Sequence, residues 1–215
     1  MLLEAARLNN IKKFVHVSTD EVYGDIMEGS FTEKSPLEPN NPYSASKAGA
    51  EMIARSYYKT YKIPLCIVRG NNVFGPRQFP EKIIPRFTTN LIQDKKLPLH
   101  GDGSPIRTYI FVKDFCTALD AIFQKGKEGE IYNIGTEDEI SNLELAKLIL
   151  KKFGKDESYI ENVTDRPFND KRYSVELSKI KELGWKQQYE FDSALDETIE
   201  WYKNNEDWWK EKIIE

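Results

Sequence analysis

Short, β-rich apolar runs alternate with stretches of helical periodicity in this sequence, from residue 2 to about residue 153. Such alternation is typical of βα units, in which a helix connects two parallel strands. Two buried strands are expected at residues 13–18 and 64–69, with a helix at residues 43–61 between them. We therefore predict an α/β protein with a parallel sheet.

Local signals define the remaining elements. Asn41 is available as a helix cap, and Pro42 suits the first helical turn, where its missing N–H costs nothing. We expect further strands at residues 107–111, at 130–134 and near 159, and further helices at residues 2–8, 80–94, 112–125, 142–153, 176–183 and 193–203.

Composition excludes several classes of function. A net charge of -4 in 215 residues gives no overall attraction for nucleic acid, and the cations are scattered among acids. No apolar run reaches the roughly 20 residues that a membrane span requires. The first residues do not resemble a signal peptide, so we expect a cytoplasmic protein without nucleic-acid or membrane partners.

Cysteine and histidine offer little chemistry. Cys66 and Cys116 lie in apolar contexts without CxxC spacing, and we expect two buried, reduced thiols. His16 and His100 are the only histidines, and neither has metal-ligand spacing or a neighbouring nucleophile. We expect no metal site and no hydrolase triad.

A hydroxyl and two adjacent carboxyls follow the first predicted strand, in the sequence VSTDEVYG at residues 17–24. Open parallel sheets bind their ligands beyond the carboxyl ends of their strands, where Thr19, Asp20 and Glu21 are expected. Taken alone, such a stretch more often begins a solvated loop.

The second motif is YSASK at residues 43–47, where Tyr43 and Lys47 stand four apart at a helix start and share one face. An ammonium beside a phenol favours the phenolate, so we expect the pKa of Tyr43 to be lowered and the phenol to serve as a base. Taken alone, this pair occurs on many helix surfaces by chance.

The two motifs together, with four others in order, carry a resemblance. STDEVYG, NPYSASKAGAE, RGNNVFGPRQFPEKIIP, GSPIRTYIFVKD, GEIYNIGT and DRPFNDKRY resemble the nucleotide-sugar 4,6-dehydratases of the extended short-chain dehydrogenase/reductase family, over essentially the whole chain. Members convert dTDP-glucose or UDP-glucose to the 4-keto-6-deoxy sugar with NAD. The fold implied is the C-terminal part of a Rossmann-type parallel sheet with a smaller mixed α/β substrate-binding lobe.

The resemblance implies a role for each catalytic residue. Tyr43, helped by Lys47, takes the proton of the sugar 4-hydroxyl while hydride leaves C4 for NAD. Glu21 then removes the C5 proton, Asp20 protonates the departing 6-hydroxyl, and Thr19 hydrogen-bonds the C4 oxygen. Two adjacent carboxyls also push their pKa values apart, which suits one acid and one base.

The resemblance also implies the ligand contacts. Ser18, Tyr43 and Lys47 are expected at the cofactor. The nucleotide-sugar set is expected to comprise Asn72, Glu81, Lys82, Arg107, Asn133, Arg166 and Tyr173. The two arginines suit the diphosphate because a guanidinium binds such groups in a bidentate manner.

Two features depart from the family pattern. Bacterial dTDP-glucose dehydratases usually carry a histidine where this chain has Phe168-Asn169-Asp170, which resembles eukaryotic and viral relatives. The nucleotide is therefore left open between uracil and thymine. No glycine-rich phosphate turn is present, so we expect an N-terminally truncated sequence.

The expected division assigns residues 1–70 and 108–135 to the NAD-binding part, and residues 71–107 and 136–215 to the nucleotide-sugar domain. Relatives commonly dimerise through the helix that bears the YxxxK motif, so a homodimer is expected.

Two alternatives remain open. A nucleotide-sugar epimerase or decarboxylase shares Tyr43 and Lys47 but lacks the Asp-Glu pair. A noncatalytic fragment that binds nucleotide sugar is favoured by the absent glycine turn.

Overall fold

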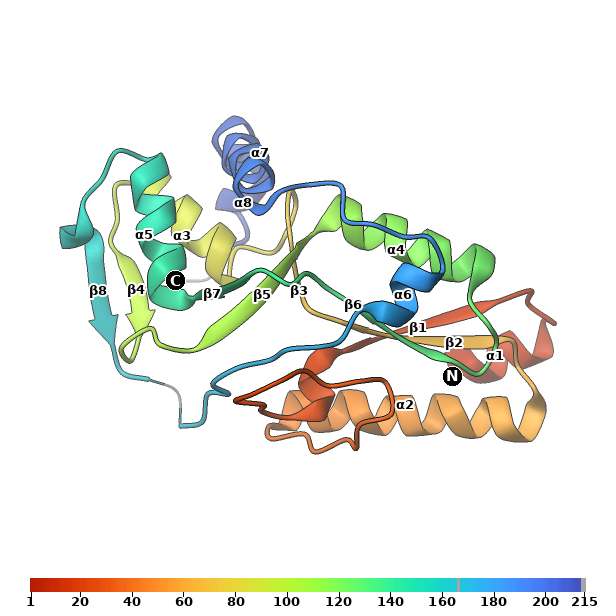
Figure 1. Cartoon of the computed structure of the whole chain (residues 1–215). Helices are drawn as coiled ribbons and strands as arrows, with labels where there is room; N and C mark the ends of the chain where they lie inside the picture. Colours follow the sequence, from red (N-terminus) through yellow and green to blue (C-terminus); the bar gives the residue numbers. More distant parts are fainter. Residues whose placement is uncertain (166, 214–215) are drawn as a thin grey trace.

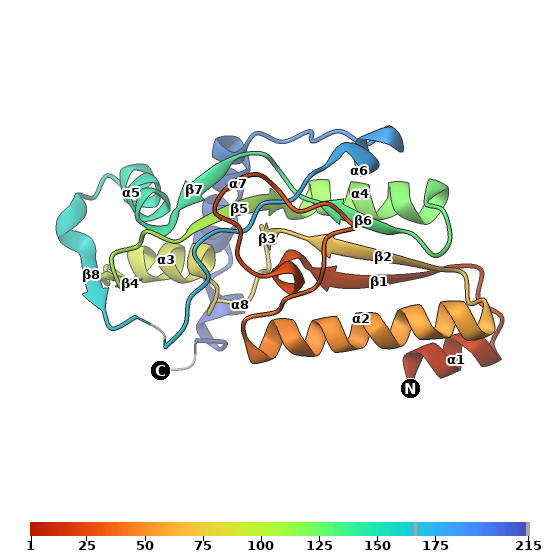
Figure 2. The same cartoon turned by 60° about the horizontal axis from the view of Figure 1, so that its bottom comes forward.

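Three parallel strands in the order β1-β2-β6 form the sheet that carries the predicted motifs. They are β1 (Phe14–Thr19), β2 (Leu65–Gly70) and β6 (Ile131–Ile134). In the computed structural model, which describes residues 1–165 and 167–213, α2 (Pro42–Tyr61) covers one face of this sheet and α4 (Val112–Lys125) covers the other (Figure 1). The view in Figure 2 shows α1 (Leu2–Leu8) beside the far end of α2.

The helix α2 is defined by its ends. The Asn41 side chain accepts a hydrogen bond from the backbone N–H of Ser44 while the Ser44 side chain bonds back to Asn41, which is a reciprocal cap. The helix ends at Lys62, whose φ of 56° is left-handed, and Pro64 follows. This cap fixes where Tyr43 enters the helix.

A second group of elements lies at the other end of the molecule. The strand β5 (Ile106–Phe111) pairs in parallel with β3 (Asn72–Phe74) and in antiparallel with β7 (Glu139–Ser141). A separate parallel pair joins β4 (Leu97–His100) to β8 (Ile160–Val163). The helices and turns outside the first sheet are α3 (Ile83–Ile92), α5 (Asn142–Lys152), α6 (Ser178–Glu182), α7 (Phe191–Asn204), α8 (Glu206–Lys210), η1 (Asp20–Tyr23) and η2 (Glu157–Tyr159).

Two main apolar cores correspond to these two groups, and β5 belongs to both. Ile110 packs in the core of the first sheet, whereas its neighbours Tyr109 and Phe111 pack in the core formed by α3, α5 and α7. Successive strand side chains point to opposite sides, so one strand can fill both cores. The segment from Val175 to Trp185 also contributes to the first core, so the chain returns there before α7.

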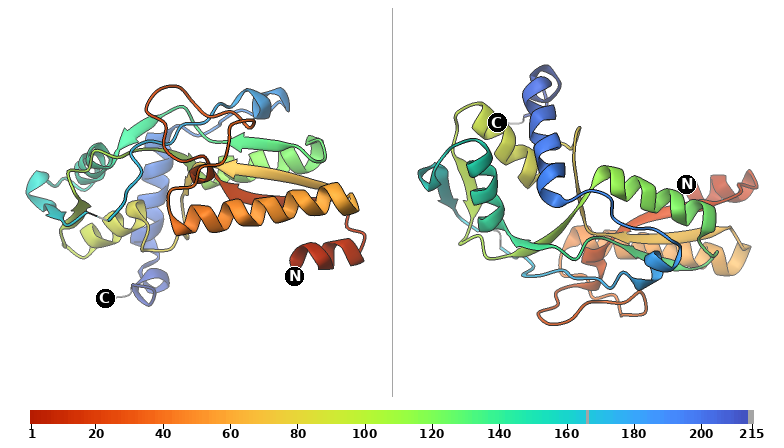
Figure 3. Two further views of the ribbon diagram at one scale, coloured as in Figure 1. Left: turned by 90° about the horizontal axis from the view of Figure 1, so that it is seen from below. Right: turned by 45° about the horizontal axis from the view of Figure 1, so that its top comes forward.

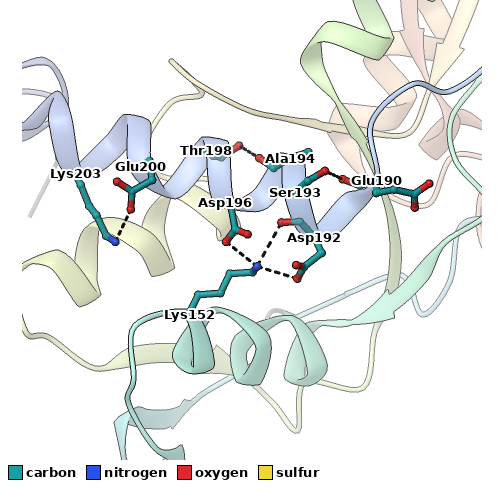
Figure 4. A network of polar contacts seen from close by, with 9 residues as sticks. All are labelled: Lys152, Glu190, Asp192, Ser193, Ala194, Asp196, Thr198, Glu200 and Lys203. Carbon is teal, nitrogen blue, oxygen red and sulfur yellow. Dashed lines mark hydrogen bonds and ion pairs between the residues drawn. The ribbon is translucent and has the colours of Figure 1, made fainter.

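The C-terminal helices α7 and α8 belong to the second group of elements, and α7 packs in its core. In Figure 3 the blue helices α7 and α8 lie with the second group of elements, well apart from the red helix α1. Lys152 of α5 reaches across to α7, where its Nζ lies 2.8 Å from Asp192 and 2.7 Å from Asp196 (Figure 4).

Most predicted elements are confirmed. The helices at residues 2–8 and 112–125 have the expected bounds, and the other predicted helices and strands differ only at their ends. Three short strands, β3, β4 and β7, and the helix α8 were not expected. The prediction that both thiols are buried is wrong for Cys116, because Phe115 and Ala118 face the core while Cys116 lies on the exposed side of α4. Cys66 is buried as expected.

Candidate active site

The strand register brings polar residues together at the carboxyl end of the sheet. Thr19 pairs with Gly70 and Gly70 with Ile134, so the residues that follow, Asp20 and Asn71, emerge side by side. Gly135 follows β6, and a Cβ built on it would lie 1.6 Å from Asn71 Oδ1. Glycine at 135 therefore makes room for the Asn71 side chain.

Asp20 is a buried carboxyl with neutral hydrogen-bond partners. Its side chain is 2% exposed, and it accepts hydrogen bonds from Asn71 Nδ2 at 2.6 Å and from Thr19 Oγ1 at 3.3 Å. Burial raises the pKa of Asp20 to about 7, although these bonds act in the opposite direction. Near neutral pH this carboxyl can therefore carry a proton and donate it.

Glu21 is half-buried beside Asp20. Burial is also the main cause that raises the pKa of Glu21, while a hydrogen bond of 3.5 Å from Asn41 Nδ2 acts to lower it. The two acids thus differ in depth and in partners. This difference is what an acid and a base working side by side require.

Tyr43 faces both acids, at the first turn of α2. The pKa of Tyr43 is raised, first by burial and then by the charges of Glu21 and Asp20, while a hydrogen bond with the Thr19 side chain acts to lower it. The phenol, the threonine and the two carboxyls therefore converge, although they come from β1, η1 and α2.

The expected lowering of the Tyr43 pKa is wrong in this structure. Lys47 donates its Nζ hydrogen bond to the backbone oxygen of Val17 at 2.7 Å, and its charge is not among the influences on the phenol. The four-residue spacing places Tyr43 and Lys47 on the same side of α2. The Lys47 ammonium nevertheless bonds the Val17 carbonyl of β1 and not the phenol.

Arg107 and Tyr173 are in contact with each other, and the Arg107 charge acts on both acids. The Arg107 guanidinium lies 4.6 Å from the centre of the Tyr173 ring and donates from Nη2 to the Asp170 backbone oxygen at 2.8 Å and to Asn169 Oδ1 at 3.1 Å. Its positive charge acts to lower the pKa values of Asp20 and Glu21, so it faces them. Arg166 lies outside the described residues.

Three other predicted ligands lie at the start of β3 and just before α3. Glu81 and Lys82 are exposed just before α3, with 3.1 Å between the Lys82 ammonium and the Glu81 carboxylate. The charge of Lys82 acts to lower the pKa of Glu21, which places it toward the site. Asn72 is half-buried at the start of β3, one residue after Asn71.

Asn133 is separated from this group by burial. Its side chain is 0% exposed, accepts a hydrogen bond from Tyr23 at 2.8 Å, and donates to the backbone oxygens of Phe31 and Glu176 at 3.2 and 3.3 Å. All of its hydrogen-bonding groups are used within the protein. A ligand contact by this side chain therefore has no support in the structure.

Sequence reasoning missed three residues around the acids: Asn71, Asn41 as a partner of Glu21, and Asp170. Asn71 had a usable signal, because it directly follows a buried strand next to the one that ends at Thr19. Asp170 gave none, because it is brought to Asn41 only by a chain return of some 130 residues.

One observation bears on the predicted cofactor. The Ser18 hydroxyl, at the end of β1, is buried and has no hydrogen-bond partner among the described residues. A buried hydroxyl without a partner is costly, and it suits a site completed by a bound polar group. Lys47 of α2 bonds the backbone oxygen of Val17, the residue before Ser18, so Ser18 and Lys47 fit the nicotinamide end of the predicted cofactor.

Two further findings concern residues 1–165 and 167–213. No group of three or more His, Cys, Asp or Glu residues is placed to hold a metal ion. No helix in the same ranges is long and apolar enough to cross a membrane.

A parallel sheet with helices on both faces and polar side chains gathered at its carboxyl end defines a Rossmann-like α/β protein. The sequence profile of the GDP-mannose 4,6 dehydratase family matches residues 1–198, and the chain belongs to this family.

Relatives and solved structures agree with this assignment. A trifunctional UDP-glucose 4,6-dehydratase, 3,5-epimerase and reductase of Arabidopsis thaliana is 46% identical over 97% of this chain and 32% of its own length. The crystal structure of dTDP-glucose 4,6-dehydratase from Bacillus anthracis in complex with NAD has a TM-score of 0.94 and 47% identity, covering 99% of this chain and 68% of that one. UDP-glucuronic acid 4-epimerase from Bacillus cereus, at 29% identity, has a TM-score of 0.89 and covers 94% of this chain and 65% of its own. The chain therefore spans from about a third to about two thirds of these proteins.

Proposed function

We propose that this protein catalyses NAD-dependent dehydration of a nucleotide-diphospho-glucose, dTDP-glucose or UDP-glucose, to the 4-keto-6-deoxy sugar. The observation that carries the proposal is the convergence of the Tyr43 phenol with two carboxyls whose pKa values are both raised. A 4-epimerase needs the phenol but not an acid and a base for loss of water, so the carboxyl pair favours dehydration.

Tyr43 would act as the base that takes the proton of the sugar 4-hydroxyl. With the phenol protonated and Lys47 bonded to Val17, the site needs added positive charge or a shift of Lys47 before the proton can move. Thr19, which is hydrogen-bonded to Tyr43, would turn its hydroxyl from Asp20 to donate to the same sugar oxygen.

The elimination would be divided between the two acids. Once C4 is a ketone the C5–H becomes acidic, and Glu21 removes that proton. Asp20, with its pKa of about 7, protonates the departing 6-hydroxyl so that water leaves. Burial favours the protonated form of Asp20, since no cation among the described residues is hydrogen-bonded to this carboxyl.

The nucleotide sugar and NAD would be bound by two different sets of residues. We assign Asn72, Glu81, Lys82, Arg107, Arg166 and Tyr173 to the nucleotide sugar, with the cations on the diphosphate. Ser18, Tyr43 and Lys47 would hold the nicotinamide end of NAD. When bound, NAD would supply a hydride acceptor for the sugar C4 and, once reduced, the hydride for C6, while the proton that Glu21 removed returns to C5.

The finer assignments belong to the same proposal. We infer a cytoplasmic homodimer joined through α2, whose outer face exposes Met52 and Ile53 at 45% and 56%. Sedimentation of the purified protein tests this state. The division into residues 1–70 and 108–135 for the cofactor, and 71–107 and 136–215 for the sugar, is part of the same inference.

The test supplies the purified protein with NAD and either UDP-glucose or dTDP-glucose. Formation of the 4-keto-6-deoxy product supports the proposal, and its absence with both sugars contradicts it. Tyr43→Phe should lower the rate about 10²- to 10⁴-fold, the range for one acid–base group. The matched control is Tyr61→Phe, because Tyr61 is as exposed on the same helix but lies at its far end.

The Glu21→Gln variant separates dehydration from the epimerase alternative. It should abolish loss of water while the oxidation at C4 persists. That oxidation is measured by the near-ultraviolet absorbance of the reduced cofactor. Normal dehydration by this variant would show that Glu21 is not the base. Calorimetric titration with NAD addresses the noncatalytic alternative, which tight binding would contradict.

A further inference from the structure

Asp170 is a buried acid at a junction that the proposed reaction does not use. Its side chain is 4% exposed, and its carboxylate accepts hydrogen bonds from Asn40 Nδ2 at 2.9 Å, from Asn41 Nδ2 at 3.4 Å and from the Tyr173 hydroxyl. No cation is hydrogen-bonded to the carboxylate among the described residues. Such a group fixes the direction of the donors around it.

The Asn41 amide has every hydrogen-bonding group engaged. Its Oδ1 accepts from the Ser44 backbone N–H at 2.9 Å, while its Nδ2 donates to Asp170 at 3.4 Å and to Glu21 at 3.5 Å. If the amide turned over, its oxygen would face two carboxylates and its NH₂ would face a backbone N–H. Asp170 and the helix cap together therefore hold one N–H of Asn41 toward Glu21.

We propose that Asp170 is a positioning residue that acts through the Asn41 amide to orient the Glu21 carboxylate for removal of the C5 proton. This inference rests on the proposed function, in which Glu21 is the base. Asp170 itself touches neither the sugar nor the reacting atoms.

Asp170 also contacts Arg107 and Tyr173, which are assigned to the nucleotide sugar. The Asp170 backbone oxygen accepts a hydrogen bond from Arg107 Nη2 at 2.8 Å, and its side chain holds Tyr173, over which the Arg107 guanidinium lies. Asp170 thus positions both Glu21, through Asn41, and the arginine assigned to the diphosphate.

Several charges surround Glu21, and the two residues of the junction act on it in opposite directions. Arg107 from β5 and Lys82 before α3 act to lower the pKa of Glu21, and so does the hydrogen bond from Asn41, whereas the Asp170 charge acts to raise it. Asp20 precedes Glu21 in the chain, and Tyr43 faces it from α2. Changes at Asp170 and at Asn41 should therefore shift the Glu21 pKa with opposite signs.

The experiment follows the Glu21 carboxyl by ¹³C NMR in protein labelled at glutamate, with Glu21→Gln to assign the signal. Asp170→Asn should lower the Glu21 pKa by about half a unit or more, because a neighbouring negative charge is lost. Asn41→Ser keeps an oxygen for the helix cap but loses the amide donor, and it should raise the pKa. The control Asp120→Asn removes an exposed charge on α4 and should leave it unchanged.

Turnover separates positioning from a merely structural role. Asp170→Asn should lower kcat on the order of tenfold with a smaller change in KM, and should move the acidic limb of the kcat profile to lower pH. An unchanged Glu21 pKa in both folded variants, or a kcat equal to that of the unaltered protein, overturns the inference. Thermal unfolding identifies any variant that fails to fold, and Asn41→Ser then decides. Absence of turnover by the unaltered protein contradicts the proposed function alone, because the titration needs no turnover.

Discussion

Two buried carboxylates in this molecule lie at similar depth but have different partners. Glu51 of α2 is 0% exposed and forms a two-pronged ion pair with Arg69 of β2, with 3.0 Å from Arg69 Nε to Glu51 Oε2. Asp20 is 2% exposed, and its hydrogen-bond donors within residues 1–165 and 167–213 are the neutral side chains of Asn71 and Thr19.

The hydrogen-bond partners of a buried charged group decide whether burial changes its protonation state. Around Arg69, burial acts to lower the pKa, but the hydrogen bonds and charge of Glu51 reverse this, and the guanidinium stays charged. It is further held over the Tyr23 ring at 4.6 Å. Around Asp20 no cation in the described part of the chain is hydrogen-bonded to the carboxyl, and burial raises its pKa to about 7. The first site joins α2 to the sheet, and the second can donate a proton.

The largest effect is expected from breaking the paired site. Glu51→Gln leaves the Arg69 charge buried without its partner, which should cost about 3–5 kcal/mol of unfolding free energy. Urea denaturation at pH 7 measures this loss. The double variant Arg69→Met with Glu51→Leu removes both charges and should recover most of it, and a loss as large as in the single variant would contradict the argument.

The unpaired site should respond in the opposite sense. Asp20 has a folded-state pKa raised from 3.8 to about 7, so the folded protein loses stability as pH rises between these values while the unfolded chain ionises. Asp20→Asn cannot ionise and lacks this slope. Its advantage over the unaltered protein should grow from about pH 4 to pH 7 and reach roughly 2–4 kcal/mol. Denaturation at a series of pH values checks this, and a pH-independent difference would refute it.

A smaller change tests the neutral donor beside Asp20. The hydrogen bond from Asn71 acts to lower the pKa of Asp20, so Asn71→Ala should raise that pKa further, by about one unit or roughly 1.4 kcal/mol. The ¹³C signal of the Asp20 carboxyl reports it. Asn90→Ala, which removes a half-buried asparagine that donates to the Lys96 backbone oxygen, is the control. A downward shift on Asn71→Ala would show that water replaces the lost donor.

The smallest effect is expected where charges pair in solvent. Lys152 bonds Asp192 and Asp196, which are 69% and 58% exposed in their side chains (Figure 4). Asp196→Asn should cost less than about 1 kcal/mol, because water screens the pair and Asp192 remains. Urea denaturation in low and high salt measures it. A cost near that of Glu51→Gln would mean that burial is not what separates the two kinds of site.

The helices and longer strands, and the strand ends at which the polar side chains lie, follow from the sequence alone. Periodicity located the strands that end near Thr19 and Gly70, and the cap residues Asn41 and Pro42 fixed the start of the helix bearing Tyr43, because these signals act within a few residues. The short strands β3, β4 and β7 were missed, since three or four residues carry too little pattern to separate a strand from a loop.

The tertiary structure alone decided the state of each group. Tyr43 and Lys47 share a helix face by their spacing, yet the Val17 carbonyl accepts the ammonium and burial beside two acids raises the phenol pKa. Asp170 reaches Asn41 only because the chain returns to the first sheet. Spacing along the sequence places side chains on faces, but burial and partners from distant segments set their charge.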